Sequence, residues 1–180
     1  MLDALDSDHR AITEQLADPA NATHTDEAMT RREQLVIDMV GHFVAEEQYL
    51  YPTVRDQLAD GAVRASGGFS ADREIEKQLK SLEDPDLGAD GLAQIWTAIQ
   101  HEFADHVSRQ QQLFIDLAAV CSPAQLAELG DGIAGAEQLA PTRPRTVALE
   151  SPGANKFISF VEGYVDHVRD YYAKRGVEDE

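Results

Sequence analysis

The sequence is poor in cysteine, poor in basic residues and free of long apolar runs. Cys121 is the only cysteine, so the chain can form no internal disulfide and no thiolate metal cluster. This cysteine usage is typical of a reducing compartment, and we expect a cytoplasmic protein. No apolar run approaches the ~18 residues that a membrane span needs. The opening MLDALDSDHR is acidic where a signal peptide is positively charged, so we expect an unprocessed chain.

Negative charge dominates the composition. The 15 Lys and Arg residues are outnumbered by 33 Asp and Glu residues, which gives a net charge of −18. Such a charge repels nucleic-acid phosphates and anionic membrane surfaces. We therefore expect neither a nucleic acid nor a membrane as a partner.

Apolar residues recur at helical spacing along almost the whole chain, whereas alternating strand-like runs are absent. This pattern predicts an all-α protein built as an up-down four-helix bundle. Thr25 is the expected N-cap of the second helix, with a kink at Pro52, and the paired glycines of GAVRASGG predict a break before the third helix. The four expected helices cover about residues 2–18, 25–58, 70–83 and 91–121.

Additional helices are expected after the bundle. SPAQ, residues 122–125, has the pattern of a capping box with Pro at the first helical position and predicts a fifth helix. APTRPRTVALESPGAN is a linker without an apolar period, and FISFVEGYVDHVRDYYAKR predicts a sixth, amphipathic helix. We therefore divide the chain into a bundle, 1–121, and a C-terminal helical extension, 122–180, that packs on it.

The stretch GHFVAEEQYLYP places polar residues on a buried face. At about 100° per residue, Glu46 falls near His42 at the centre of an apolar stripe, whereas Glu47 is rotated toward solvent. An unpaired carboxylate in a dry core costs several kcal/mol, so Glu46 needs a cation, a metal ion or a proton.

Two further histidines occupy apolar stripes. His9 shares a face with Leu5 and Ile12 of the first helix, and His106 shares one with Gln110 and the apolar residues of the fourth. His101 lies about 140° from His106 and should be exposed. A single inward histidine is more often a hydrogen-bonded core residue than a ligand. Three of them on three helices, one followed by an i+4 glutamate, favour a metal site for iron or manganese.

The third helix offers two more carboxylates, each with two interpretations. Asp72 is either a metal ligand or a first-turn carboxylate favoured by the helix dipole. Glu76 is either a ligand or a surface residue paired with Lys80 at i+4.

Several stretches of the chain match a known family. They are DSDHRAI, HFVAEEQYLYP, IEKQLKSL and HVSRQQQLF, with CSPAQLAELG, APTRPR and ANKF in the tail. The sequence resembles the hemerythrin-like proteins, the HHE cation-binding domains, and in particular the actinobacterial members with extra C-terminal helices. The resemblance implies a bundle that encloses two non-haem irons. It assigns His9, His42 and Glu46 as ligands, with Glu46 bridging, and His106 as the fourth-helix histidine.

The sequence departs from the family pattern at two positions. Asp72, with Glu76 four residues later, stands where a third-helix histidine is expected, and Gln110 stands where a second bridging carboxylate is expected. Extra carboxylate donation favours the ferric state. The site is therefore expected to activate O₂ or peroxide for oxidation of an unidentified small substrate, with Tyr49 as a donor to a bound oxygen species.

Other functions fit the same residues. The chain could be a non-enzymatic module that binds, senses or stores O₂, nitric oxide or iron. It could also be a bundle that has lost one metal, with a single iron or manganese remaining, because Gln110 is a poor replacement for a bridging carboxylate.

Overall fold

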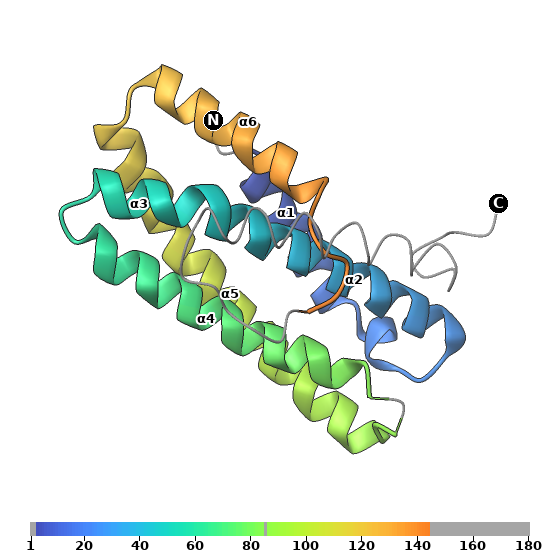
Figure 1. Ribbon diagram of the computed structural model, residues 1–180. Helices are drawn as coiled ribbons and strands as arrows, with labels where there is room; N and C mark the ends of the chain where they lie inside the picture. The colour runs from blue at the N-terminus through green and yellow to red at the C-terminus, as the bar shows by residue number, and fades with distance from the viewer. Residues whose placement is uncertain (1–2, 85, 145–180) are drawn as a thin grey trace.

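The computed structural model describes residues 3–84 and 86–144, and within them the chain is helical and contains no strand. Figure 1 shows α2, the π-helical turn η2 and α3 in one long rod, with α4 beside it. The elements are α1 (Asp3–Ala17), the 3₁₀ turn η1 (Pro19–Ala22), α2 (Asp26–Ala45), η2 (Glu46–Leu50), α3 (Tyr51–Gln57), α4 (Gly61–Leu82), α5 (Ala89–Val120) and α6 (Pro123–Glu137). The predicted all-α bundle with extra helices is confirmed.

Local sequence signals set the helix ends. The Oγ of Thr25 accepts a hydrogen bond from the Ala28 amide at 3.1 Å, as expected of an N-cap. Ser122 and Gln125 form the predicted capping box at the start of α6. Helix α6 packs on α1, α2 and η2 (Figure 1). The expected sixth helix and its His167 lie outside the described residues.

The rod changes its helical pitch near Pro52 rather than simply bending there. The amide of Tyr51 donates to the carbonyl of Glu46, five residues earlier, which closes the π-helical turn. Pro52, in the first turn of α3, has no amide hydrogen to donate. The wider turn alters the rotation of every side chain within it, so the 100° rule no longer places those side chains on their faces.

The predicted break at GAVRASGG is wrong, because these residues form the first turns of α4. The glycines are used for close packing instead. A Cβ on Gly68 would lie 2.5 Å from Cε1 of Tyr51, and a Cβ on Gly61 would overlap the Val54 carbonyl. The helix therefore starts earlier than expected, and Asp72 lies well inside α4 rather than in its first turn.

A polar layer separates two apolar clusters of the core. On α1 the layer lies between Leu5 and Ile12, and on the rod it lies between Met39 and Leu50. Ile12 and Met39 belong to one cluster, and Leu5 and Leu50 belong to the other. The same division holds on α5, between Phe103 and Leu113. The buried polar side chains of this layer are His9, His42, Glu46, Asp72, His106 and Gln110.

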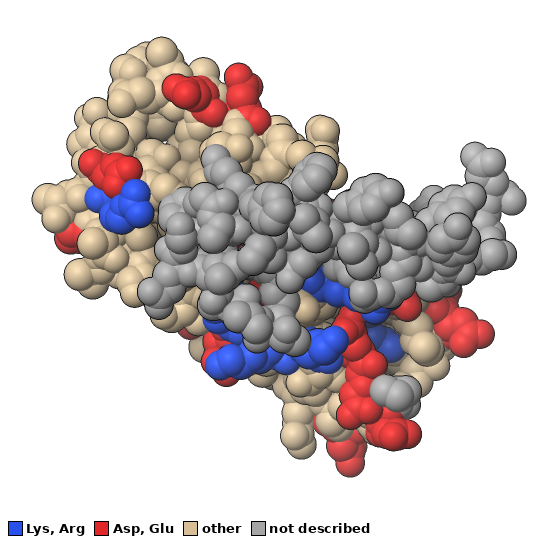
Figure 2. Space-filling model, viewed as in Figure 1, with Lys and Arg blue, Asp and Glu red and all other residues tan. Residues whose placement is uncertain are grey.

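The surface follows the acidic composition. Figure 2 shows acidic side chains gathered on the visible face near the connection of α4 to α5, where Asp84, Asp86 and Asp90 are exposed. Within the described residues no helix is long and apolar enough to cross a membrane.

Two neighbouring glycines of α4 allow a matched test of the packing. We expect Gly68→Ala to destabilise the fold by about 1–3 kcal/mol, because the Tyr51 ring is buried and hydrogen-bonded and cannot move aside without cost. Gly67→Ala should be neutral or stabilising by up to about 1 kcal/mol, because its Cβ meets nothing within 4 Å. Urea unfolding measures both. Equal effects of the two substitutions would contradict the close packing of α3 on α4.

Candidate metal centre

Four potential ligands from three helices and the π-helical turn meet inside the bundle. They are His9 of α1, His42 of α2, Glu46 of η2 and His106 of α5, and one donor atom from each lies within 4.8 Å of the others. None of these residues is more than 2% exposed. The structure thus brings together the three inward histidines and the glutamate that the sequence singled out.

The donor atoms converge on one carboxylate oxygen. Nε2 of His42 lies 2.8 Å from Oε1 of Glu46, and Nε2 of His106 lies 3.4 Å from the same oxygen. The two Nε2 atoms are 3.3 Å apart. The ring centroid of His9 lies 4.7 Å from that of His42 and 5.4 Å from that of His106. This is the arrangement of side chains that face a common point.

His9 gives the clearest evidence that a metal ion fits. Both of its ring nitrogens are buried and have no hydrogen-bond partner in the described part of the chain, which is costly for a polar group. Burial and the neighbouring positive charge of His42 lower the pKa of His9 to about 3, so its lone pair stays free. Three imidazoles and one carboxylate form a donor set suited to non-haem iron or manganese.

Two carboxylates lie near the Nδ1 atoms of His42 and His106, on the opposite side of each ring from Glu46. Nδ1 of His42 lies 3.5 Å from Oδ2 of Asp8, and Nδ1 of His106 lies 3.0 Å from Oδ1 of Asp72. A carboxylate hydrogen-bonded to Nδ1, as Asp72 is to His106, fixes the tautomer and leaves Nε2 as the ligand atom. Asp72 therefore contacts the cluster as the partner of His106. Asp8 was not predicted as a partner of His42, because it is one of several acidic residues near His9.

Glu46 also receives two neutral donors. The Nε2 of Gln110 donates to Oε1, and the Tyr51 hydroxyl lies 3.1 Å from Oε2. The same hydroxyl lies 2.7 Å from Oδ2 of Asp72, so its one proton is shared between two carboxylates. Burial and the charge of Glu46 raise the pKa of Asp72. Tyr51 was not among the site residues predicted from the sequence, because regular helical periodicity does not predict the π turn that precedes it.

The other expected residues lie elsewhere. The ring of Tyr49 packs against Gly132 of α6. His101 has a side chain that is 77% exposed, 3.7 Å from Asp105, so its surface prediction is confirmed. Lys80 pairs with Glu83 at 2.8 Å rather than with Glu76.

Glu47 and Glu76 are both buried against Arg73. The guanidinium lies 3.3 Å from Oε1 of Glu47 and 3.5 Å from Oε2 of Glu76. The prediction that Glu47 faces solvent is wrong, since it is fully buried. The π turn rotates it inward. Glu76 lies outside the group of four donor atoms that meet at Glu46.

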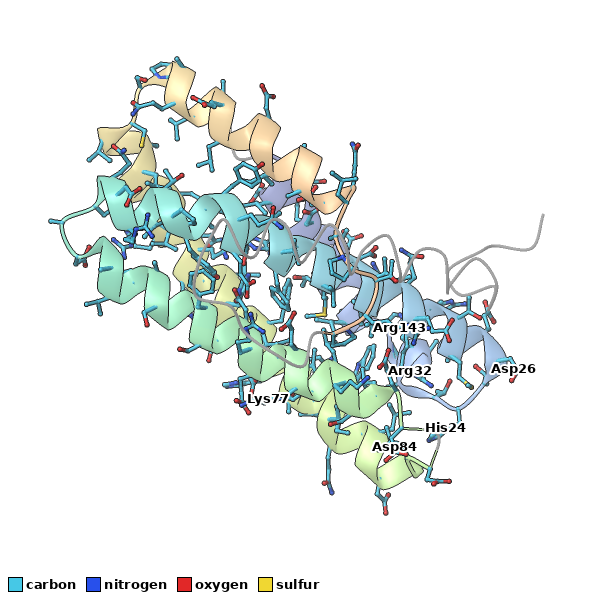
Figure 3. The ribbon with its side chains drawn as sticks, in the orientation of Figure 1. His24, Asp26, Arg32, Lys77, Asp84 and Arg143 are labelled. Atoms are coloured by element: carbon cyan, nitrogen blue, oxygen red, sulfur yellow. The ribbon has the colours of Figure 1, made fainter. Side chains whose placement is uncertain are left out.

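A pocket leads to this cluster between α4 and α5. It measures about 480 Å³, and His106, Gln110 and Tyr51 line it. A second pocket of about 380 Å³ lies at the far end of the bundle, where Figure 3 shows His24, Arg32, Asp84 and Arg143 around the start of α2 and the end of α4. This second pocket does not reach the cluster residues, whereas a third, of about 380 Å³, is lined by His42 and Asp8.

Comparison with known proteins agrees with this geometry. The family model described as "Hemerythrin HHE cation binding domain" matches residues 1–118, which include all four clustered ligands. No curated protein and no solved structure matches the chain.

The protonation of the cluster leads to a prediction about pH. Burial lowers the pKa of His42 and His106, but the charge of Glu46 and the nearby carboxylates of Asp8 and Asp72 outweigh it and raise these values to about 10 and about 9. A histidine whose pKa is raised on folding stabilises the folded state by its full amount at a pH below its unfolded-state pKa of about 6.5. This stabilisation is lost as the pH rises through the folded-state pKa.

Metal-free protein should therefore lose free energy of unfolding between pH 7 and 10, as measured by urea unfolding in the presence of a chelator. His42→Gln should flatten this dependence, because it removes one titrating group and its raised pKa. A stability that stays constant or rises over this range in the unsubstituted protein would contradict the assigned charges.

Proposed function

The chain belongs to the hemerythrin HHE cation-binding family, and on that premise we propose that it is a non-haem iron protein that reacts with O₂ or peroxide to oxidise a small substrate. The observation that carries the proposal is the meeting of His9, His42, Glu46 and His106 within 4.8 Å. The unsatisfied nitrogens of His9 support a bound ion at this point.

These four residues would hold one iron, or manganese in its place. A bound iron supplies a Lewis acid and an electron donor for O₂ or peroxide. Nitric oxide is a further diatomic partner for the same position. Four protein ligands leave coordination positions open for such a molecule in an ion that prefers more than four ligands.

The surrounding residues prepare the site for this chemistry. Asp8 and Asp72 keep the Nε2 atoms of His42 and His106 directed toward Glu46. Burial and the negative charges of Asp72 and Glu46 raise the pKa of Tyr51 well above its usual value, so its hydroxyl keeps its proton and remains a donor.

Aromatic rings restrict water around the ligands. The ring of Phe103 stacks on His106 at a centroid distance of 5.4 Å, and that of Phe114 stacks on His9 at 6.0 Å. Phe43 lies 5.5 Å from His106 by the same measure. Such apolar walls strengthen the electrostatic contacts inside the site and limit side reactions with water.

A second candidate is the two-iron centre that the family resemblance implies. Its support is the position of the Tyr51 hydroxyl, which reaches one oxygen of Glu46 and one oxygen of Asp72. A second iron would take these two carboxylates and Glu76. In the present geometry Asp72 is engaged with His106, and Glu76 is engaged with Arg73. The one-metal arrangement therefore needs less rearrangement.

Anaerobic loading with Fe(II), followed by addition of peroxide and a reducing phenol, tests the proposal. We expect about one iron per chain and catalytic consumption of peroxide. His106→Ala should lower the iron content about tenfold or more at limiting iron, because it removes a ligand. His101→Ala is the matched control on the same helix and should change nothing, since its side chain is exposed.

Each other result has a defined meaning. Two irons per chain would favour the second candidate. A stable O₂ or nitric oxide adduct without turnover would replace the enzyme with a binding or sensing module. Absence of iron after loading, or iron loss in His101→Ala but not in His106→Ala, would contradict the site itself.

A further inference from the structure

The pocket between α4 and α5 has the size of a site for a small organic molecule. Its volume is about 480 Å³, within the range of typical ligand pockets. Gly67, Gly68 and Ala71 line its α4 side, and the lack of large side chains at these positions leaves the space open. The opposite wall comes from α5.

Two arginines line the pocket, and they differ in their partners. Nη1 of Arg64 lies 2.7 Å from Oδ2 of Asp116 and 3.7 Å from Asp60, so its charge is compensated. Arg109 is exposed and makes no ion pair with any residue that the structure describes. In a chain with a net charge of −18, an uncompensated guanidinium at a pocket is a specific attraction for an anion, above all for a carboxylate.

Gln110 supplies an unused acceptor beside the metal ligands. Its Nε2 is fixed by Glu46, which leaves Oε1 as the remaining polar atom. Gln110 is only 2% exposed, and Oε1 has no hydrogen-bond partner in the part of the chain that the structure describes. A buried carbonyl without a donor is costly, and an O–H group of a ligand would satisfy it.

The remaining lining consists of Tyr51, Leu113, His106 and Gln112. The Tyr51 ring and Leu113 face the same pocket. The Tyr51 ring is fixed, because its hydroxyl bonds Glu46 and Asp72. An aromatic ring packs well against such a surface.

We propose that this pocket binds a small aromatic carboxylate that carries a hydroxyl group, with the carboxylate at Arg109 and the hydroxyl at Gln110. This inference deepens the proposed function and rests on it for one point only, which is that the bound molecule is the substrate of the metal centre. Binding itself depends on residues of the pocket.

Calorimetry with three probes tests the assignment on iron-loaded protein. The probes are 4-hydroxyphenylacetate, phenylacetate, which lacks the hydroxyl, and 4-hydroxyphenethyl alcohol, which lacks the carboxylate. We expect 4-hydroxyphenylacetate to bind. Each of the other two probes should bind with an affinity at least about tenfold lower, because each leaves one polar group of the pocket without its partner.

Variants separate the pocket from the rest of the surface. Arg109→Gln should weaken 4-hydroxyphenylacetate about tenfold and leave 4-hydroxyphenethyl alcohol unchanged. Arg55→Gln is the control, since Arg55 is paired with Asp56 and is absent from the pocket lining. Gly67→Leu should block the pocket without disturbing α4, because a Cβ at this position meets nothing within 4 Å.

Equal binding of the three probes, no binding of any probe, or an unchanged affinity in Arg109→Gln would overturn the proposal. Iron content is measured on the same samples. Iron-loaded protein that fails to bind 4-hydroxyphenylacetate contradicts the pocket assignment alone. Protein that binds it through Arg109 but holds no iron contradicts the proposed function alone.

Discussion

Burial of the Glu46 carboxylate is the constraint on which the rest of the site depends. Glu46 is fully buried between two apolar clusters of the core, where an uncompensated charge costs several kcal/mol. Oε1 is contacted by His42, His106 and Gln110, and Oε2 by Tyr51. Helices α2, α3 and α5 therefore each bring a donor to this point, which constrains how these helices face one another. A bound cation would complete this compensation, and the proposed function follows from it.

The π-helical turn and the glycines of α4 make this arrangement possible. The turn carries Glu46 and Glu47 into the interior, so that Glu47 meets Arg73 of α4. It also brings the Tyr51 hydroxyl to Glu46, while Gly68 leaves room for the Tyr51 ring. A non-standard turn at a functional site is a common use of the π-helix. Here the π turn makes the position of the Glu46 carboxylate depend on the packing of α3 on α4.

Much of the cluster could be predicted from helical periodicity, because α1, α2 and α5 are regular up to the residues that matter. His9, His42 and His106 face inward as the 100° rule requires. The rule failed for Glu47, which lies within the π turn. A separate prediction failed at the glycines of α4, where intrinsic propensity favoured a break but close packing decided the outcome. The contact of Asp8 with His42 depends on how two helices pack, and periodicity within one helix carries no such information.

The proposed function requires that three imidazoles and one carboxylate bind a single metal ion. X-ray absorption at the iron edge of the loaded protein tests it most directly, because imidazole rings give a characteristic multiple-scattering pattern. We expect scattering from the three histidines of the cluster, lost in part in His9→Ala, with no iron–iron contribution. A spectrum without imidazole scattering, or one with a clear iron–iron contribution, would contradict it.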